Sequence, residues 1–347
     1  MAFRVLVAGG AGLVGSAVAR QLLSEGAEVA VVDAMGDEGD GRAVREERAQ
    51  ALRAFARATV VTADISLPGA ASDVFRDLKP AAVVNAALFP PGGPGVDSML
   101  EAMRSPEKPF LVHLSDGALY GAPASQGQPA LEEEPIDPGH DPVLLQRMVE
   151  ESRLRGSDVP YVILRLFGIL APGAPANRFP QDALETLLDG REVVVPSDAP
   201  QDLLHVRDAV HGILAALALR PAGRTVNLGC GRGVAPARVV RLLAERSFRQ
   251  VRIRVDQAPV RPGRIASLAR ASELLRFQPK TSLETSVEEI VAARLGAPES
   301  TTSRLRPPAP LSRPAAPRSP ESVEPKEVSR RELFGFFRRP FDGGRSR

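Results

Sequence analysis

The sequence predicts an α/β protein with a doubly wound parallel sheet, followed by a smaller C-terminal α+β domain and a disordered tail. Three observations carry this prediction. Runs rich in Val and Ile alternate with amphipathic stretches over residues 1–170, a pattern typical of βαβ units. A glycine-rich turn joins the first run to the first helical stretch. The alternation then loosens after Pro172.

The elements can be assigned in order along the chain. In the first part, buried strands are expected at 3–9, 28–34, 58–65, 81–88, 109–115 and 161–170, with helices at 15–26 and 143–155 among the connections. In the second part, the pattern predicts helices at 182–190, 235–247 and 286–296 and strands at 224–230 and 251–256. Residues 297–328 are rich in Pro, Ser and Arg and should form a disordered linker.

Composition narrows the classes of protein. Of 44 Lys/Arg and 42 Asp/Glu residues, 11 and 6 lie in 297–347, so residues 1–296 are mildly acidic and a nucleic-acid surface there is not expected. A single cysteine, Cys230, excludes an internal disulfide and favours the cytoplasm. The four histidines show no metal-ligand spacing, so no metal is expected. The first residues read as a strand rather than a signal peptide, and no run reaches the roughly 20 apolar residues of a membrane span.

The clearest site motif is Gly9-x-x-Gly12-x-x-Gly15, between a predicted strand and a predicted helix. Such glycines permit a tight turn, close approach of the backbone to a pyrophosphate, and close packing of helix on strand. The helix N-terminus then favours the phosphates. Asp33 follows Gly15 by 18 residues, near the spacing of about 20 expected for a ribose contact. We therefore expect a Rossmann-type site for NAD, because Asp33 would repel the 2′-phosphate of NADP.

Three further residues near this motif have two interpretations each. Arg42 and Arg45 weaken the preference for NAD slightly, or they belong to a solvated charged helix. Asp64 at the end of the third strand can contact the adenine edge or cap the next helix.

Eight segments bring a family into view: "VAGGAGLVGS", "TADI", "VVNAAL", "FLVHLSDGALYG", "ILRLFGILAPG", "QDLLHVRDAVHGILAAL", "TVNLGCG" and "RPGR". Through them, residues 1–296 resemble the extended short-chain dehydrogenases/reductases, the NAD-dependent epimerase/dehydratase group acting largely on nucleotide sugars. The resemblance implies NAD as cofactor, a nucleotide sugar or similar small molecule as substrate, and a possible homodimer. It implies cofactor contacts from Gly9, Gly12, Leu13, Val14, Gly15, Asp33, Asp64, Ile65, Ala86 and Arg147.

The same resemblance implies a domain organisation. Residues 1–170 would form the NAD-binding Rossmann domain, to which the chain returns near 203–230. Residues 171–296 would form the substrate-binding cap. The linker at 297–328 then leads to an aromatic and basic motif at 329–347, which holds four phenylalanines among arginines.

The sequence departs from the family's pattern at the residues that transfer the substrate's proton. Its members use a tyrosinate that takes the substrate's hydroxyl proton, a lysine four residues later, and a Ser/Thr on the fifth strand. In "DPVLLQRMVEE", Val143 stands at the tyrosine position and Arg147 at the lysine position. Asp116 occupies the Ser/Thr position and follows Ser115. Valine cannot relay a proton and arginine stays charged at any workable pH, so the usual relay is not expected.

The candidate catalytic residues are therefore Asp116, Ser115 and Arg147. Asp116 could act as a base whose pKa is raised by burial, or it could be a satisfied carboxylate at a strand end. His113 should share a strand face with Ser115. His140, with Asp137 and Asp141, could reach a substrate or belong to a solvated acidic loop.

In the second part, Arg207 and Arg261, together with Arg264, are candidates for binding a substrate diphosphate, or they are surface charges. His205 and Asp208 are interpreted as structural residues at a helix entry. The 329–347 motif could bind a protein partner, lie on an anionic membrane surface, or fold back on the body.

Three functions follow. The first is a NAD-dependent epimerase/dehydratase-like oxidoreductase with non-standard acid/base residues. The second is a catalytically degenerate NAD-binding scaffold or sensor that recruits a partner through its tail. The third, an NADP-linked reductase, is opposed by Asp33.

Overall fold

The computed structural model describes residues 4–37, 41–93, 95–104, 108–121, 128–256 and 263–296. Its centre is a seven-stranded sheet in the order β10-β6-β5-β4-β1-β2-β3, in which all neighbours are parallel. The strands are β1 (Arg4–Ala8), β2 (Glu28–Asp33), β3 (Ala58–Thr62), β4 (Ala82–Asn85), β5 (Phe110–Asp116), β6 (Tyr161–Leu166) and β10 (Arg224–Leu228). The order reverses between β1 and β4, so the predicted doubly wound α/β sheet is confirmed.

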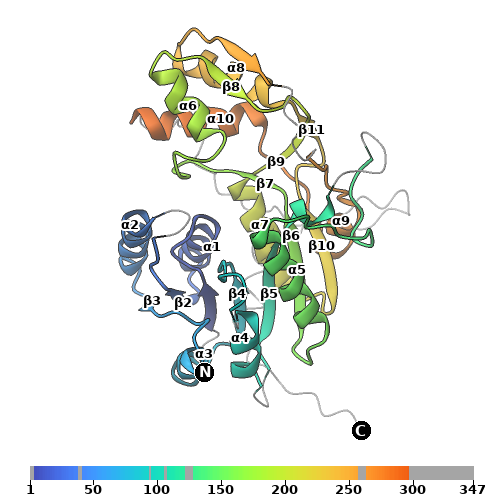
Figure 1. Ribbon diagram of the computed structural model, residues 1–347. Coiled ribbons are helices and arrows are strands. Elements are labelled where there is room, and N and C mark those ends of the chain that lie inside the picture. The colour runs from blue at the N-terminus through green and yellow to red at the C-terminus, as the bar shows by residue number, and fades with distance from the viewer. Residues whose placement is uncertain are drawn as a thin grey trace, which may run out of the picture.

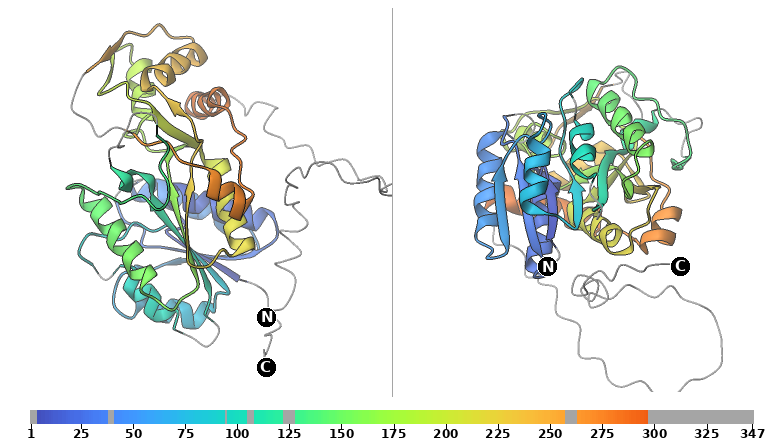
Figure 2. Two further views of the ribbon diagram at one scale, coloured as in Figure 1. Left: turned by 90° about the vertical axis from the view of Figure 1, so that its right-hand side faces the viewer. Right: turned by 90° about the horizontal axis from the view of Figure 1, so that it is seen from below.

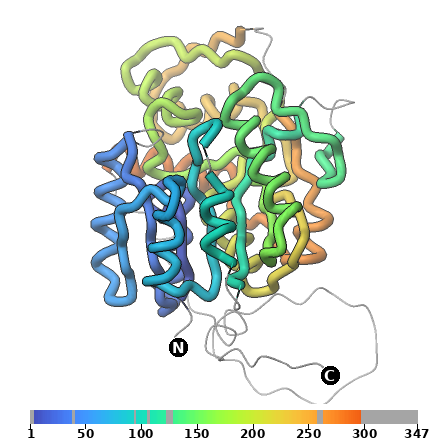
Figure 3. The backbone as a smooth tube through the Cα atoms, turned by 60° about the horizontal axis from the view of Figure 1, so that its bottom comes forward, coloured from blue at the N-terminus to red at the C-terminus, as the bar shows by residue number. Residues whose placement is uncertain are grey.

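Helices cover both faces of this sheet (Figure 1, Figure 3). Alternate side chains of one strand enter different cores: Val5 and Val7 point to one face, Leu6 and Ala8 to the other. All four are fully buried, which explains why the strands are continuous apolar runs. One face is covered by α1 (Leu13–Ser24), α2 (Arg42–Arg53) and α7 (Val206–Leu219), and the other by α3 (Ala70–Leu78), α4 (Val96–Ala102) and α5 (Pro142–Arg155).

The second part of the chain stands beyond the carboxyl ends of the main strands (Figure 1, Figure 2). Its core consists of α6 (Gln181–Leu188), α8 (Pro236–Ser247) and α10 (Leu283–Leu295), packed around β8 (Val193–Val195) and β12 (Ile253–Val255). A three-stranded sheet stands between this core and the main sheet, formed by β11 (Gly233–Val234), β9 (Gln201–His205) and β7 (Gly168–Leu170). The smaller C-terminal α+β part is therefore confirmed.

Two details of the fold differ from, or extend, the predicted elements. The strand expected at 161–170 is two strands, β6 and β7, which belong to different sheets. Gly168 permits the change because a Cβ there would lie 2.8 Å from the carbonyl oxygen of Asp202 on β9. The later strand β10 joins the main sheet beside β6, and α9 (Ala269–Leu275) packs against α7 and β10.

The predicted linker and the 329–347 motif lie outside the described residues. Among the residues that are described, no helix has the length and apolar character needed to span a membrane.

Candidate active site

The glycine-rich turn after β1 has no room for a side chain at Gly9, Gly10 or Gly15. Gly9 has a positive φ of 69°, and a Cβ there would lie 2.6 Å from a backbone nitrogen just beyond β4. A Cβ at Gly15 would overlap the carbonyl oxygen of Gly9. Gly12 is the N-cap of α1 and no side chain caps that helix. The first-turn N–H groups, beginning with Leu13 and Val14, can therefore bind phosphate oxygens, so the turn fits a dinucleotide pyrophosphate.

Asp33 ends β2 beside this turn and is 4% exposed. Its carboxylate accepts hydrogen bonds from the backbone N–H groups of Ala11 and Met35, both at 3.0 Å. Arg45 on α2 places Nη1 3.1 and 3.2 Å from the two carboxylate oxygens. The interpretation of Arg45 as part of a solvated helix is therefore wrong, because the buried Asp33 charge needs a counter-charge.

The other predicted cofactor residues follow neighbouring strands. Asp64 accepts hydrogen bonds from the backbone N–H of Ser66 at 2.9 Å and from its hydroxyl at 2.6 Å. It holds a turn and does not cap α3, whose N-cap is Gly69. Ile65 is buried in the core beneath this turn. Ala86 follows β4, and its carbonyl oxygen lies 2.7 Å from the position of a Cβ on Gly9.

The start of α5 holds the predicted Tyr and Lys positions. Val143 there is 43% exposed, so its side chain meets solvent. Arg147, one turn later, is buried and donates from Nη1 to Glu150 Oε2 at 2.7 Å and from Nη2 to the Ala87 carbonyl oxygen at 3.0 Å. Glu150 is fully buried, and this burial raises the pKa of its carboxyl although Arg147 opposes the shift. The guanidinium at the lysine position thus binds groups of the protein itself.

His113 lies on β5 behind this pair and is fully buried. Asn85 Oδ1 accepts from the backbone N–H of Ala87, so its Nδ2 donates to His113 Nδ1 at 3.0 Å. That arrangement leaves the proton on Nε2, which lies 3.5 Å from Glu150 Oε2. Burial and then the Arg147 charge lower the pKa of His113 to about 3. His113 is therefore neutral at physiological pH and poorly suited to accept a proton.

Ser115 shares the His113 face of β5, as predicted, and is buried. Its hydroxyl donates to Glu151 Oε1 at 2.6 Å, and Arg165 on β6 donates to both oxygens of the same carboxylate at 2.9 and 2.6 Å. These bonds, with one from Arg155, outweigh desolvation and lower the pKa of Glu151 to about 2. The structure therefore places Ser115 in a buried hydrogen-bond network with Glu151 and Arg165, because strand alternation turns it toward α5.

Asp116 is the last residue of β5 and is half-buried. Its Oδ1 accepts from the Ala118 backbone N–H at 2.8 Å, which caps a short 3-10 helix. Burial raises the pKa of the Asp116 carboxyl. The charges of Arg147 and Arg178 oppose this rise, and that of Asp141 adds to it. Asp116 is thus a carboxyl group at the end of β5, within electrostatic reach of Arg147.

In the second part, Arg207 does not stand free. Its Nη2 donates to Glu289 on α10 at 2.8 Å, and His205 Nε2 lies 3.2 Å from the same carboxylate. Asp208 accepts from the backbone N–H groups of residues 280 and 281. The structural interpretation of His205 and Asp208 is therefore confirmed, whereas Arg207 is part of an ion pair between helices. Arg261 lies outside the described residues.

The acidic segment 132–141, before α5, makes hydrogen bonds and an ion pair with the rest of the protein, which a solvated loop would not make. Glu132 accepts from the backbone N–H of Asn227 at 2.9 Å, and Glu134 accepts from Arg264 at 2.7 Å. Asp141 is the N-cap of α5. His140 is exposed. Arg264 is therefore a buried structural partner and not a surface charge.

Glu150 and Arg165 were not singled out by sequence reasoning. Both had a signal. Glu150 follows Arg147 by three residues on one helix, a spacing at which opposite charges meet. Arg165 interrupts an otherwise apolar buried strand, where a charged side chain needs a buried partner.

Comparison with known proteins places this site in a family. Residues 5–229 match the model of the NAD dependent epimerase/dehydratase family. A UDP-glucose 4-epimerase of Azospirillum brasilense is 29% identical over 362 residues, covering 87% of this chain and 97% of the relative. UDP-glucose 4-epimerase 4 of Oryza sativa subsp. japonica is 27% identical, covering 81% and 87%.

Solved structures show the same fold. UDP-glucuronic acid 4-epimerase from Bacillus cereus, in complex with UDP-glucuronic acid and NAD, gives a TM-score of 0.74 at 20% identity and covers 84% of this chain and 100% of its own. The dTDP-glucose 4,6-dehydratase from Bacillus anthracis, in complex with NAD, gives a TM-score of 0.77 at 18% identity and covers 85% and 97%. The family match includes the glycine turn, Asp33 and β5, so the cofactor is NAD. The chain belongs to the NAD-dependent epimerase/dehydratase family.

Proposed function

We propose that the protein is an oxidoreductase of the epimerase type that acts on a nucleotide sugar, with Asp116 as its acid/base. The observation that carries this is the position of Asp116. It ends β5 at the carboxyl edge of the sheet, in electrostatic reach of Arg147, while the tyrosine position holds an exposed valine. Within the described site, His113 is neutral and Ser115 is bound to Glu151, so Asp116 is the group best suited to take a proton.

In the proposed epimerisation, the proton of the substrate hydroxyl is transferred by one group of the chain, the Asp116 carboxylate. NAD, when bound, supplies the hydride acceptor and later the hydride donor. Ionised Asp116 would remove the proton of the substrate hydroxyl as the carbon loses its hydride, and would return it after the sugar presents its other face. The raised pKa makes Asp116 a stronger base than an ordinary carboxylate. The ion pair with Glu150 fixes the position of the Arg147 charge that acts on Asp116.

A nucleotide sugar is proposed as the substrate from the relatives, several of which are UDP-glucose 4-epimerases. The part beyond the main sheet would form its binding cap. Arg261 is kept as a candidate diphosphate ligand. Arg207 is a weaker one, since its guanidinium already binds Glu289. The single cysteine fits a reducing cytoplasm, which we propose as the location.

The test is turnover by the purified chain. It would be incubated with NAD⁺ and UDP-glucose, UDP-glucuronic acid and dTDP-glucose, with products followed by NMR. We expect epimerised or oxidised sugar from the wild type and none from Asp116→Asn, with NAD⁺ affinity retained. Because the base form is needed, kcat/KM should rise with pH through an apparent pKa above the ordinary Asp value. Turnover that survives in Asp116→Asn would contradict the assignment.

A second function has its own supporting observation. Both arms of Arg147 bind within the protein, and Val143 offers no hydroxyl, so the site can hold NAD without turnover. Such a protein would be a scaffold or sensor that uses residues 329–347 to recruit a protein partner. NAD⁺ binding without product from any sugar, together with capture of a partner that is lost on truncation at residue 328, would favour this function over the first.

A further inference from the structure

Asp33 and Arg45 form a charge pair at the adenosine end of the cofactor site. Nη1 of Arg45 reaches both carboxylate oxygens of Asp33, and the pair is nearly buried, with side-chain exposures of 18% for Arg45 and 2% for Asp33. The same Nη1 lies 3.9 Å from the position of a Cβ on Gly12. Arg45 therefore stands between the acid that reads the ribose hydroxyls and the turn that holds the pyrophosphate.

We propose that this pair lets the site accept a phosphate on the adenosine 2′ oxygen, so that the protein binds NADP(H) as well as NAD(H), with Arg45 as the specificity-determining residue. A lone aspartate at the end of β2 excludes NADP by repulsion. Here Arg45 neutralises that charge, and it remains charged at any workable pH. Its planar guanidinium also suits the geometry of phosphate oxygens.

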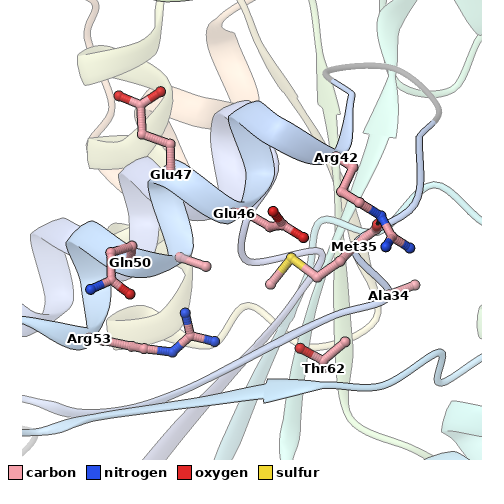
Figure 4. A pocket seen from close by; sticks show the side chains of 9 residues that line it. Ala34, Met35, Arg42, Glu46, Glu47, Gln50, Arg53 and Thr62 are labelled. Carbon is pink, nitrogen blue, oxygen red and sulfur yellow. Dashed lines mark hydrogen bonds between the residues drawn. The ribbon is translucent and has the colours of Figure 1, made fainter.

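A hollow lies beside the Asp33–Arg45 pair, where a phosphate on the adenosine 2′ oxygen would need space. The hollow begins at Ala34 and Met35, directly after Asp33, and runs between α2 and Thr62 at the end of β3 (Figure 4). Arg42 lies over its mouth beside Met35, with Nε donating to the Met35 carbonyl oxygen at 3.1 Å and its side chain 59% exposed. A 2′-phosphate leaving Asp33 in this direction would start beside Arg45, which binds both carboxylate oxygens of Asp33, and would meet Arg42 in the lining of the hollow.

Two carboxylates also line this hollow. Glu47 points away from Met35 on the other side of α2, whereas Glu46 turns toward Met35 (Figure 4). Glu46 therefore opposes the phosphate, and its effect should be measurable. Removing the Glu46 charge should tighten NADP⁺ binding, while removing the Arg45 charge should weaken it.

The experiment measures binding and not turnover, so it does not depend on the proposed function. Isothermal titration of the full chain with NAD⁺ and with NADP⁺ would be run on wild type, Arg45→Gln, Arg45→Lys, Glu46→Gln and Arg48→Gln. Arg48 is the matched control, since it lies one turn further along α2 and binds the carbonyl oxygens of Ala11 and Gly173 rather than Asp33.

We expect the wild type to bind both dinucleotides with Kd values within about tenfold of each other. Arg45→Gln should raise the Kd of NADP⁺ by about tenfold or more relative to that of NAD⁺, the size expected for a lost hydrogen bond to a charged group. Arg45→Lys should keep most of the NADP⁺ affinity, and Arg48→Gln should leave the ratio unchanged. Absence of NADP⁺ binding in a wild type that binds NAD⁺ would overturn the proposal. So would an Arg45→Gln variant that weakens both equally. If Arg45→Gln does not fold, a Glu46→Gln variant with an unchanged ratio would also overturn it.

Discussion

Arg147 and Glu150 face each other across one turn of α5, with Nη1 2.7 Å from Oε2, in surroundings from which water is excluded. The two residues are coupled physically. A fully buried carboxylate at position 150 requires a cation, and the cation at the family's lysine position supplies it. The guanidinium at that position is thus half of a buried ion pair within α5.

Removing one partner should therefore destabilise the protein strongly. Arg147→Met leaves the buried Glu150 without its counter-charge, and we expect a loss of about 3–5 kcal/mol in the free energy of unfolding at pH 7. Urea denaturation followed by circular dichroism measures it. The double variant Arg147→Met/Glu150→Leu should recover most of the loss, because it removes both charges. A double variant as unstable as the single one would contradict this account.

The loss should also depend on pH, and its sign follows from Glu150. Its folded pKa is raised by burial, so it favours the folded state below the unfolded value and loses this advantage as pH rises through the folded value. Arg147 limits that rise in pKa. The deficit of Arg147→Met against the wild type should hence grow from pH 4.5 to pH 7.5. A constant deficit would mean that Glu150 is not ionised in the folded protein.

Glu151 should behave in the opposite way. Its folded pKa is lowered to about 2 from an ordinary value of 4.5, so its contribution is present above 4.5 and is lost as pH falls toward 2. Glu151→Gln leaves Arg165, which is 2% exposed, without its carboxylate, at an expected cost of about 3–5 kcal/mol. That cost, measured by urea denaturation, should shrink between pH 6 and pH 3.5. Ser115→Ala, which removes one hydrogen bond to the Glu151 carboxylate, should cost less, about 1.5–3 kcal/mol.

The sheet could be predicted from the sequence because β1, β2, β4, β5 and β6 are buried along most of their length and appear as predominantly apolar runs. The glycine turn and Asp33 were predictable for a related reason, since their spacing is imposed by local backbone geometry. Arg45 was not predictable in the same way. Whether a surface-helix arginine turns to solvent or onto Asp33 depends on how α2 lies against β2, which a linear pattern does not record.

The side-chain contacts at the end of β5 and on α5 were also only partly predictable from the sequence. The absence of tyrosine at position 143 could be read directly, and strand alternation correctly placed His113 and Ser115 on one face. The partners could not be read, because Ser115 meets Glu151 and Glu134 meets Arg264 only through packing between elements 36 and 130 residues apart. The short split at Gly168 was also hidden, since it depends on the approach of β9.

If only the tyrosine and lysine side chains of the family's proton relay are missing, substitutions at positions 143 and 147 should restore it. Position 143 is exposed in the first turn of α5, so a tyrosine there should be tolerated within about 0.5 kcal/mol. The variant Val143→Tyr/Arg147→Lys/Glu150→Gln returns the tyrosine and a lysine that no carboxylate captures. We expect its epimerase rate, measured by NMR, to exceed that of the wild type by about tenfold or more. Val143→Phe in the same background is the control, and an equal rate there would show that the new hydroxyl is not the cause.

The outer face of α5 offers a test of the homodimer that the family resemblance implies. Leu145 and Val149 lie four residues apart and are 38% and 44% exposed, so they form an apolar stripe on a helix that packs beside α4. We propose that a second copy of the chain covers this stripe. Leu145→Glu should convert a dimeric wild type to a monomer in light scattering at micromolar concentration, because a buried unpaired charge at an interface is costly.

Leu219→Glu provides the matched control. Leu219 is 40% exposed at the end of α7, on the other face of the main sheet, so the same new charge there should leave the oligomeric state unchanged. Loss of the dimer in both variants would indicate general destabilisation rather than a specific interface. A wild type that is monomeric at these concentrations would rule out the α5 interface and leave the stripe as an ordinary exposed surface.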